Sequence, residues 1–140
     1  MKKFLTATLA IILLIACSKE KKALKHLPGE WDMISWFVDS SGVEIDFLGQ
    51  LQSDSTSMSV SMDFSDCNAG ETCEAITTIT LSVMGISMSI PDTSTYSVSS
   101  DGEYILLDGD TNDIIELGSS SLSLGYHDSE GYNTMSFEKM

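Results

Sequence analysis

The alternation of apolar and polar residues with a period of two limits the fold of this chain more than any other feature. In residues 57–64, SMSVSMDF, it places Met58, Val60, Met62 and Phe64 on one face of a strand, opposite serines and an aspartate. Similar short segments recur to the end of the chain, separated by turn-forming clusters such as SDG, GDTN and DSEG. No segment of helical period and useful length follows residue 30. The pattern therefore predicts an all-β protein.

The spacing of these segments predicts an antiparallel up-and-down meander of about eight to ten strands. We expect strands over residues 30–38, 43–47, 56–64, 74–84, 86–90, 94–99, 103–108, 113–117, 121–127 and 133–139, with a turn at PDT, residues 91–93. Closure into a barrel would remove exposed sheet edges, and a sandwich is the alternative. The apolar positions are odd-numbered before residues 84–85 and even-numbered after them, which predicts a bulge or tight corner that curls the sheet.

The N-terminus has the features of a secretory signal. Residues 1–16, MKKFLTATLAIILLIA, combine a basic start, a short apolar centre and a small residue before Cys17, and they are too short to span a bilayer comfortably. Residues 14–17, LIAC, resemble the lipobox of bacterial lipoproteins; a chance cysteine after an ordinary signal is the alternative. The resemblance implies a signal helix over 1–16, a lipidated Cys17 with a short basic tether over 17–26, and a domain over 27–140. It also implies acyl-chain anchoring to the outer membrane, with the domain facing the periplasm or the cell exterior.

The charge is strongly acidic and unevenly distributed. The formal net charge is −14, the chain has no arginine, and Lys139 is the one lysine after residue 26. Such a surface repels phosphate backbones, which excludes nucleic acid as a partner. Lys19, Lys21, Lys22 and Lys25 cluster beside Cys17; they either attract the tether to an anionic membrane or merely keep a linker solvated.

Two further cysteines indicate a disulfide. Cys67 and Cys73 are separated by five residues that include a glycine, and an exported chain permits oxidation. A metal site is the alternative, but it needs two more ligands, and His26 and His127 are the only histidines. We therefore predict that a Cys67–Cys73 disulfide staples the end of a hairpin.

The domain resembles the lipocalins. Residues 29–31, GEW, resemble the Gly-x-Trp signature that starts their first strand, and residues 104–140 are similar to small lipocalin-like domains of bacterial lipoproteins. The resemblance implies a lipocalin-like β-barrel in which Trp31 plugs the closed end and a small hydrophobic or amphipathic molecule is bound. Lipocalins pack an arginine over this tryptophan, and Lys139 is expected to take its place.

The resemblance and the alternation together predict the barrel lining. Trp31 should face inward with Met33 and Phe37, and Ile34, Trp36 and Val38 should face outward. The lining and ligand-binding residues are predicted to be Trp31, Met33, Phe37, Met58, Val60, Met62, Phe64, Leu122, Leu124, Tyr126, Met135 and Phe137. A barrel of this size is at the border between an interior filled by side chains and one that holds a small ligand. A ligand-free barrel that acts as a protein-interaction module in the cell envelope is therefore the alternative function.

The sequence does not favour an enzyme. His127 and Asp128 are neighbours at a turn, and no motif for an activated serine is present. Asp108, Asp110 and Asn112 resemble the start of a calcium loop, but Asp113 replaces its glycine and Ser119 its glutamate, so we expect a hairpin turn. We expect a monomer without a cofactor.

Overall fold

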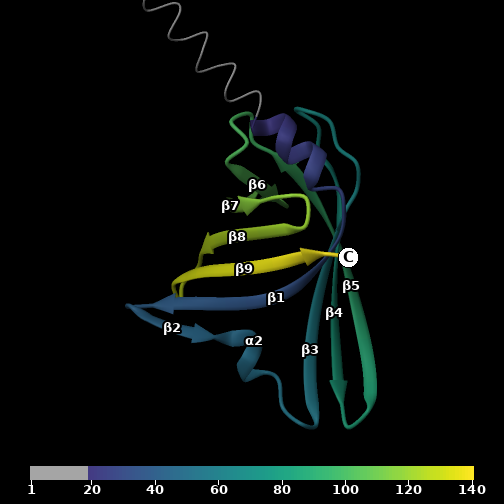
Figure 1. The fold of residues 1–140 in the computed structure, drawn as a ribbon, viewed down its shortest axis with the longest axis vertical. Coiled ribbons are helices and arrows are strands. Elements are labelled where there is room, and N and C mark those ends of the chain that lie inside the picture. The colour runs from purple at the N-terminus through teal and green to yellow at the C-terminus, as the bar shows by residue number, and fades with distance from the viewer. Residues whose placement is uncertain (1–18) are drawn as a thin grey trace, which may run out of the picture.

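The computed structural model describes residues 19–140, in which β1 (Gly29–Ser40) closes an antiparallel β-barrel. The nine strands follow the order β2–β1–β3–β4–β5–β6–β7–β8–β9, and β1 also pairs with β9, so β2 is an extra strand outside the closed ring (Figure 1). The other elements are β2 (Val43–Asp46), α2 (Phe47–Gln50), β3 (Thr56–Phe64), β4 (Cys73–Val83), β5 (Ile86–Val98), β6 (Tyr104–Leu107), β7 (Asp110–Leu117), β8 (Ser121–His127) and β9 (Tyr132–Lys139). The predicted all-β meander is confirmed.

The first strand changes partners along its length. β1 pairs with β3 over residues 29–32 and with β2 over residues 37–40, while β9 runs along its other side. Beyond Asp32, β1 and β3 therefore diverge, and Figure 1 shows β3, β4 and β5 extending away from the other strands. We call the extended part, residues 56–60, 79–83 and 86–90, the arm.

The change of phase near residue 84 comes from a hairpin turn. Met84 and Gly85 have φ of 52° and 82° and connect the paired residues Val83 and Ile86. Positive φ at both positions is typical of the two-residue turns that join antiparallel strands, so the turn does not curl the sheet. Bulges instead occur between Met33 and Ser35 and between Ile114 and Glu116.

The predicted turn at residues 91–93 is wrong, because β5 is continuous through Pro91. Pro91 is opposite Thr78 of β4 and has no strand on its other side, since β5 pairs with β6 only through residues 96–98 in the described part of the chain. In a hairpin with a two-residue turn, the pair next to the turn, here Val83 and Ile86, is hydrogen-bonded. Even-numbered residues of β5 therefore bond to β4, and odd-numbered residues such as Pro91 direct their backbone nitrogen to the open edge. The missing N–H therefore costs no ladder hydrogen bond.

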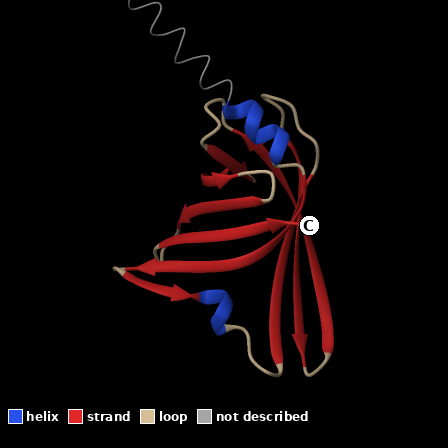
Figure 2. Cartoon of the chain, in the orientation of Figure 1, coloured by secondary structure: helices blue, strands red, loops and turns tan. Residues whose placement is uncertain are grey.

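The basic tether is not an extended linker, because residues 19–26 are helical and lie across one end of the barrel (Figure 2). Glu20, Ala23 and Leu27 are buried and Leu24 is partly buried, at the three- and four-residue spacing of one helix face. Gly102 has a φ of +70°, and a Cβ there would lie 2.5 Å from the Glu20 nitrogen. The helix backbone thus packs directly on the loop between β5 and β6, and we call this end of the barrel the closed end.

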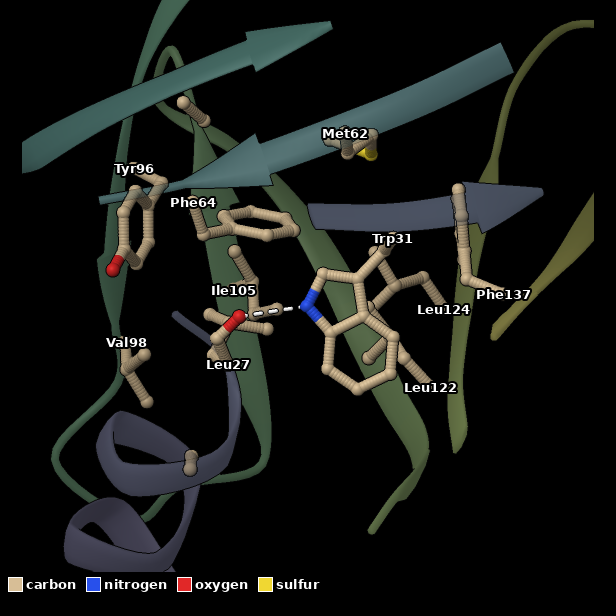
Figure 3. Packing of buried hydrophobic residues seen from close by; sticks show 12 residues of the cluster. Leu27, Trp31, Met62, Phe64, Tyr96, Val98, Ile105, Leu122, Leu124 and Phe137 are labelled. Atoms are coloured by element: carbon tan, nitrogen blue, oxygen red, sulfur yellow. Dashed lines mark hydrogen bonds between the residues drawn. The ribbon is translucent and has the colours of Figure 1, made fainter. Parts of the chain in front are cut away.

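The hydrophobic core fills the closed end (Figure 3). Trp31 is fully buried, and its Nε1 donates a 2.7 Å hydrogen bond to the Leu27 carbonyl. Lys139 Nζ lies 5.0 Å from the centroid of the Trp31 ring and donates to the His26 carbonyl, as expected for the residue that replaces the arginine. The fully buried large side chains are Leu27, Trp31, Phe64, Tyr96, Ile105, Leu122, Leu124, Asn133 and Phe137.

Burial of Tyr96 makes stability depend on alkaline pH. Tyr96 is 1% exposed and its hydroxyl donates to the Ser65 carbonyl, and burial raises the pKa of Tyr96 to about 12. Tyrosine in the unfolded chain ionises near pH 10, so the unfolded state loses this proton first as the pH rises. This contribution is fully present below about pH 10 and should be lost by about pH 12, lowering the free energy of unfolding by roughly 1–2 kcal/mol, because the hydroxyl lies near the surface and solvent screens part of the effect. Urea unfolding across this range measures the decline, which should be smaller in Tyr96→Phe; equal declines in both proteins would contradict the assignment.

The predicted disulfide joins Cys67 and Cys73, with Cα atoms 5.8 Å apart, at the end of the β3–β4 hairpin. Both cysteines pack against the core. For a loop this short, replacing both cysteines with serine should lower the free energy of unfolding by about 2 kcal/mol. Urea unfolding of oxidised wild type and of C67S/C73S measures this difference, and wild type treated with reductant should match the variant. Unchanged stability in the variant would show that the loop is held by its core contacts alone.

The expected signal peptide and the lipidated Cys17 lie outside the described residues. Within residues 19–140, no helix has the length and apolar character needed to cross a bilayer.

Candidate functional site

The inner face of the arm carries apolar side chains that the core does not cover. It continues the face of β3 that holds the buried Phe64 and Met62, and two cross-strand rows extend it toward the tip. One row is Val60–Ile79–Ile90 and the next is Met58–Leu81–Met88. The exposed fractions are 38% for Ile79, 50% for Ile90, 60% for Met88 and 77% for Ile86. An exposed apolar face of this kind is a feature that binding surfaces share.

The outer face of the arm is entirely different in character. Serine and threonine occupy it, and cross-strand hydroxyl pairs join Thr80 to Ser89 at 2.8 Å and Ser82 to Ser87 at 2.6 Å. The polar, solvent-exposed outer face and the apolar inner face follow directly from the alternation in the sequence. The arm therefore has one side suited to water and one suited to an apolar partner.

We call the end of the barrel at which β1 and β3 diverge the open end. The arm forms one wall of it, and β1 and β9 form the opposite wall. One prediction about this wall is wrong. The bulge between Met33 and Ser35 shifts the phase of β1, so that Trp36 is opposite Met135 and shares the inner face with it. Val38 is likewise opposite the buried Asn133, whereas Phe37 is opposite Thr134 and Asp46 on the outer face. Trp36 and Val38 line the barrel, and Phe37 does not.

This wall also carries fixed polar groups. Trp36 Nε1 donates to Asn133 Oδ1 at 2.9 Å, and Asn133 Nδ2 donates to Asp128 Oδ2 at 2.9 Å. Asn133 is 1% exposed, and both atoms of its amide are thus satisfied. Hydrogen bonds from the Glu130 and Gly131 backbone, followed by that from Asn133, lower the pKa of Asp128 below its ordinary value. The row therefore ends in an ionised carboxylate at the rim.

A cleft of about 470 Å³ adjoins this polar row. Tyr126 is opposite Asn133 and shares its inward face, and Leu107 is opposite the buried Tyr96. Burial, followed by the charge of Asp128, raises the pKa of Tyr126, so its hydroxyl remains a neutral donor. The lining residues are Leu107, Asp110, Thr111, Asn112, Tyr126, His127 and Asp128.

The helix α2, which the sequence interpretation missed, adds to this end of the barrel. Residue 47 was expected in a strand, but Asp46 ends β2 and caps α2, because its Oδ1 accepts a 2.8 Å hydrogen bond from the Gly49 nitrogen. The cap places the Phe47 ring 4.6 Å from that of Trp36 and buries Leu48. An aspartate three residues before a glycine was the available signal for this turn.

The predicted lining residues divide into two groups. Trp31, Met62, Phe64, Leu122, Leu124 and Phe137 are buried in the core, and Met33 and Met135 pack against it. Met58, Val60 and Tyr126 lie on the inner faces toward the open end. The predicted residues thus face inward, apart from Phe37, but most of them fill the closed end.

A larger cleft of about 580 Å³ lies beside the N-terminal helix, away from the open end. Its lining carries both signs of charge, including Lys22 and Glu116, and Lys19 pairs with Glu103 at 2.8 Å. This cleft lies between the helix and strands β6 and β7, and it shares no lining residue with the cleft at the open end. We therefore do not take it as the ligand site.

The catalytic and calcium alternatives gain no geometric support. The His127 ring packs at 4.6 Å on that of Tyr132, while the Asp128 carboxylate accepts from Glu130, Gly131 and Asn133 and so does not orient the imidazole. The expected hairpin turn is present but shorter than predicted, because Asp108 and Gly109 alone connect β6 to β7, and residues 110–112 belong to β7 rather than to the turn. Asp108 accepts from Thr95, and Asn112 is buried. Within residues 19–140, no three His, Cys, Asp or Glu side chains are grouped to hold a metal.

The fold is similar to solved lipocalin-type barrels. Japanin from Rhipicephalus appendiculatus, in a structure bound to cholesterol, has a TM-score of 0.56 and 5% identity, with 82% of this chain and 77% of that chain covered. The siderocalin Ex-FABP has a TM-score of 0.51 and 12% identity, with 82% and 74% covered. No family model and no curated protein sequence matches the chain. The structural likeness shows a lipocalin-like fold.

Proposed function

We propose that this protein is a lipoprotein, anchored through Cys17, whose barrel binds a small hydrophobic or amphipathic molecule at its open end. The observation that carries the proposal is the exposed apolar inner face of the arm, where Ile79, Met88 and Ile90 continue the core-facing side of the sheet into solvent. An apolar ligand would bury these side chains, each of which contributes up to about 1.5–3 kcal/mol when fully covered. Flexible methionines such as Met58 and Met88 adapt this face to ligands of varied shape.

The opposite wall restricts the polar part of the ligand. Asp128 is an acceptor at the rim, and the net charge of −14 repels anions. A hydroxyl or an amine on the ligand is favoured over a carboxylate or phosphate. The structure of Japanin with cholesterol, an apolar molecule with one hydroxyl, shows that this fold accommodates such a ligand in another protein.

Native mass spectrometry of the protein purified from its own envelope, before and after organic extraction, tests this function. One extractable molecule per chain, lost on extraction and regained on incubation with the extract, is expected. Failure of every extract fraction to rebind would contradict the proposal. Liberation of an anionic molecule would refute the stated preference for a neutral or cationic polar group.

A second function, a ligand-free interaction module, is favoured by one specific observation. The tip of the arm is highly exposed, with Met84 at 83%. In the described residues, the edge of β5 that faces away from β4 is paired with β6 only at residues 96–98, so its remaining length is an open edge. A protein strand could add to this edge. A chain that rebinds no small molecule but captures a partner through the arm would support this function instead.

A further inference from the structure

We propose that the closed end of the barrel lies against the membrane, with the exposed lysines of the N-terminal helix contacting anionic lipid headgroups, and that the open end points away from the bilayer. The inference rests on the proposed anchoring through Cys17. It adds an orientation and a lipid-contacting surface, which neither the lipobox nor the fold specifies.

Only a short length of chain separates the proposed anchor from the packed helix. Cys17 is two residues before Lys19, so its Cα lies within about 7 Å of the Lys19 Cα however the chain runs. Lys19 is held by its 2.8 Å ion pair with Glu103, and the next residue, Glu20, packs its backbone on Gly102. Acyl chains on Cys17 would therefore attach directly to the closed end, without the spacer that an extended tether would provide.

The helix carries its lysines away from its buried face. Its buried side, with Glu20, Ala23 and Leu27, is occupied by the barrel. Lys21, Lys22 and Lys25 are exposed, and Lys22 also borders the cleft between the helix and β7. Lysines near an anionic surface are attracted to it. Because the helix that carries them is packed on the barrel, these three lysines define a basic surface at the closed end.

The acidic residues of the domain do not oppose this contact equally. At physiological ionic strength a charge acts over a Debye length of about 8 Å, so carboxylates on the arm and the open end are screened from the bilayer. Asp66 and Glu71 in the disulfide loop are nearer, and so are Asp101 and Glu103 in the loop on which the helix packs. Glu103 is paired with Lys19, and repulsion from the other carboxylates favours a tilt that brings the exposed lysines of the helix against the headgroups.

The open end is then far from the bilayer. β4 runs from Cys73 at the closed end to Val83 at the tip of the arm, and 11 residues of strand span about 35 Å. In Figure 1 the helix and the tip of the arm lie at opposite extremes of the molecule. The ligand site would open toward the aqueous compartment rather than the anchoring membrane.

Two variants of the full, membrane-purified protein, each with one added cysteine and with the Cys67–Cys73 disulfide kept oxidised, test the orientation. Ser100→Cys lies in the exposed loop on which the helix packs, and Ser87→Cys lies on the exposed outer face near the tip of the arm. Each is labelled with a fluorophore and reconstituted in phosphatidylcholine vesicles with phosphatidylglycerol and a headgroup-spin-labelled lipid. We expect strong quenching at position 100 and none above background at position 87. Equal quenching, or stronger quenching at position 87, would overturn the orientation.

The lysine contact is tested in the same vesicles with K21Q/K22Q/K25Q. Quenching at position 100 should fall severalfold in this variant, and only when phosphatidylglycerol is present. E44Q/D54N, which neutralises two exposed residues away from the helix, is the matched control and should leave quenching unchanged. An unaffected lysine variant would overturn the headgroup contact.

The outcomes separate this inference from the proposed function. Intact mass shows whether Cys17 carries acyl chains; a chain without them would overturn both the anchoring and the orientation. Ligand rebinding is measured on the same labelled proteins. Rebinding with the wrong orientation would refute the inference alone, whereas correct orientation without rebinding would refute the ligand site alone.

Discussion

Trp31→Ala is expected to lower the free energy of unfolding by about 3–5 kcal/mol. The substitution empties a fully buried volume, removes the 2.7 Å hydrogen bond to the Leu27 carbonyl, and removes the ring beneath the Lys139 ammonium. Because Leu27 directly follows the helix, the packing of the helix on the closed end should weaken as well. Urea unfolding followed by far-ultraviolet circular dichroism measures the loss.

Trp31→Phe is the matched variant for this prediction. It keeps an aromatic ring beneath Lys139 but cannot donate to Leu27, so its loss should be smaller and should report the hydrogen bond together with the reduced volume. A loss below about 1 kcal/mol in Trp31→Ala would mean that the closed end repacks without its plug, contrary to the close packing described.

Ile79→Thr combined with Ile90→Thr is expected to weaken ligand binding by at least about tenfold, with little change in stability. The two residues are opposite each other on the inner face of the arm, and they are 38% and 50% exposed without ligand. Threonine keeps the branched β-carbon that suits a strand but replaces the ethyl group of isoleucine with a hydroxyl that the ligand would have to desolvate. A loss of about 1 kcal/mol at each position gives this factor. Titration of the extracted ligand, followed by Trp36 fluorescence or native mass spectrometry, measures it.

The outer face of the same strands supplies the control for this variant. T80A/S89A removes a hydroxyl pair on the other side of the arm and should leave ligand affinity unchanged. Equal losses in the two variants would indicate that the arm as a whole was disturbed. Unchanged affinity in the inner-face variant would place the ligand elsewhere.

The alternation in the sequence was sufficient to predict the fold class and most strand limits. β3 and β8 occupy the residues expected for them, because each has an undisturbed period of two bounded by turn residues. The disulfide and the cation over Trp31 were also predicted, from the cysteine spacing and the lipocalin resemblance.

The errors arose where a local signal depended on tertiary context. Pro91 is compatible with a strand only because its nitrogen faces an open edge, which the sequence does not reveal. The inward positions of Trp36 and Val38 depend on a bulge at Ile34 that moves one residue out of register. The residues of the tether form a helix because the barrel end provides a surface for Ala23 and Leu27. The candidate site was predicted only in part. It lies between the arm and the part of β1 that follows the bulge, where the inward-facing positions differ from those expected.

The unequal pairing of β5 also divides one strand into two dynamic regimes. Residues 96–98 have neighbours on both sides and lie in the core, whereas residues 86–90 are held by β4 alone and carry exposed side chains. Local opening requires little free energy where few buried contacts are broken and approaches the global value in the core. Amide hydrogen exchange should therefore change from fast to slow within a single strand, near Thr95. Ligands could enter and leave through fluctuations of the arm while the closed end stays folded.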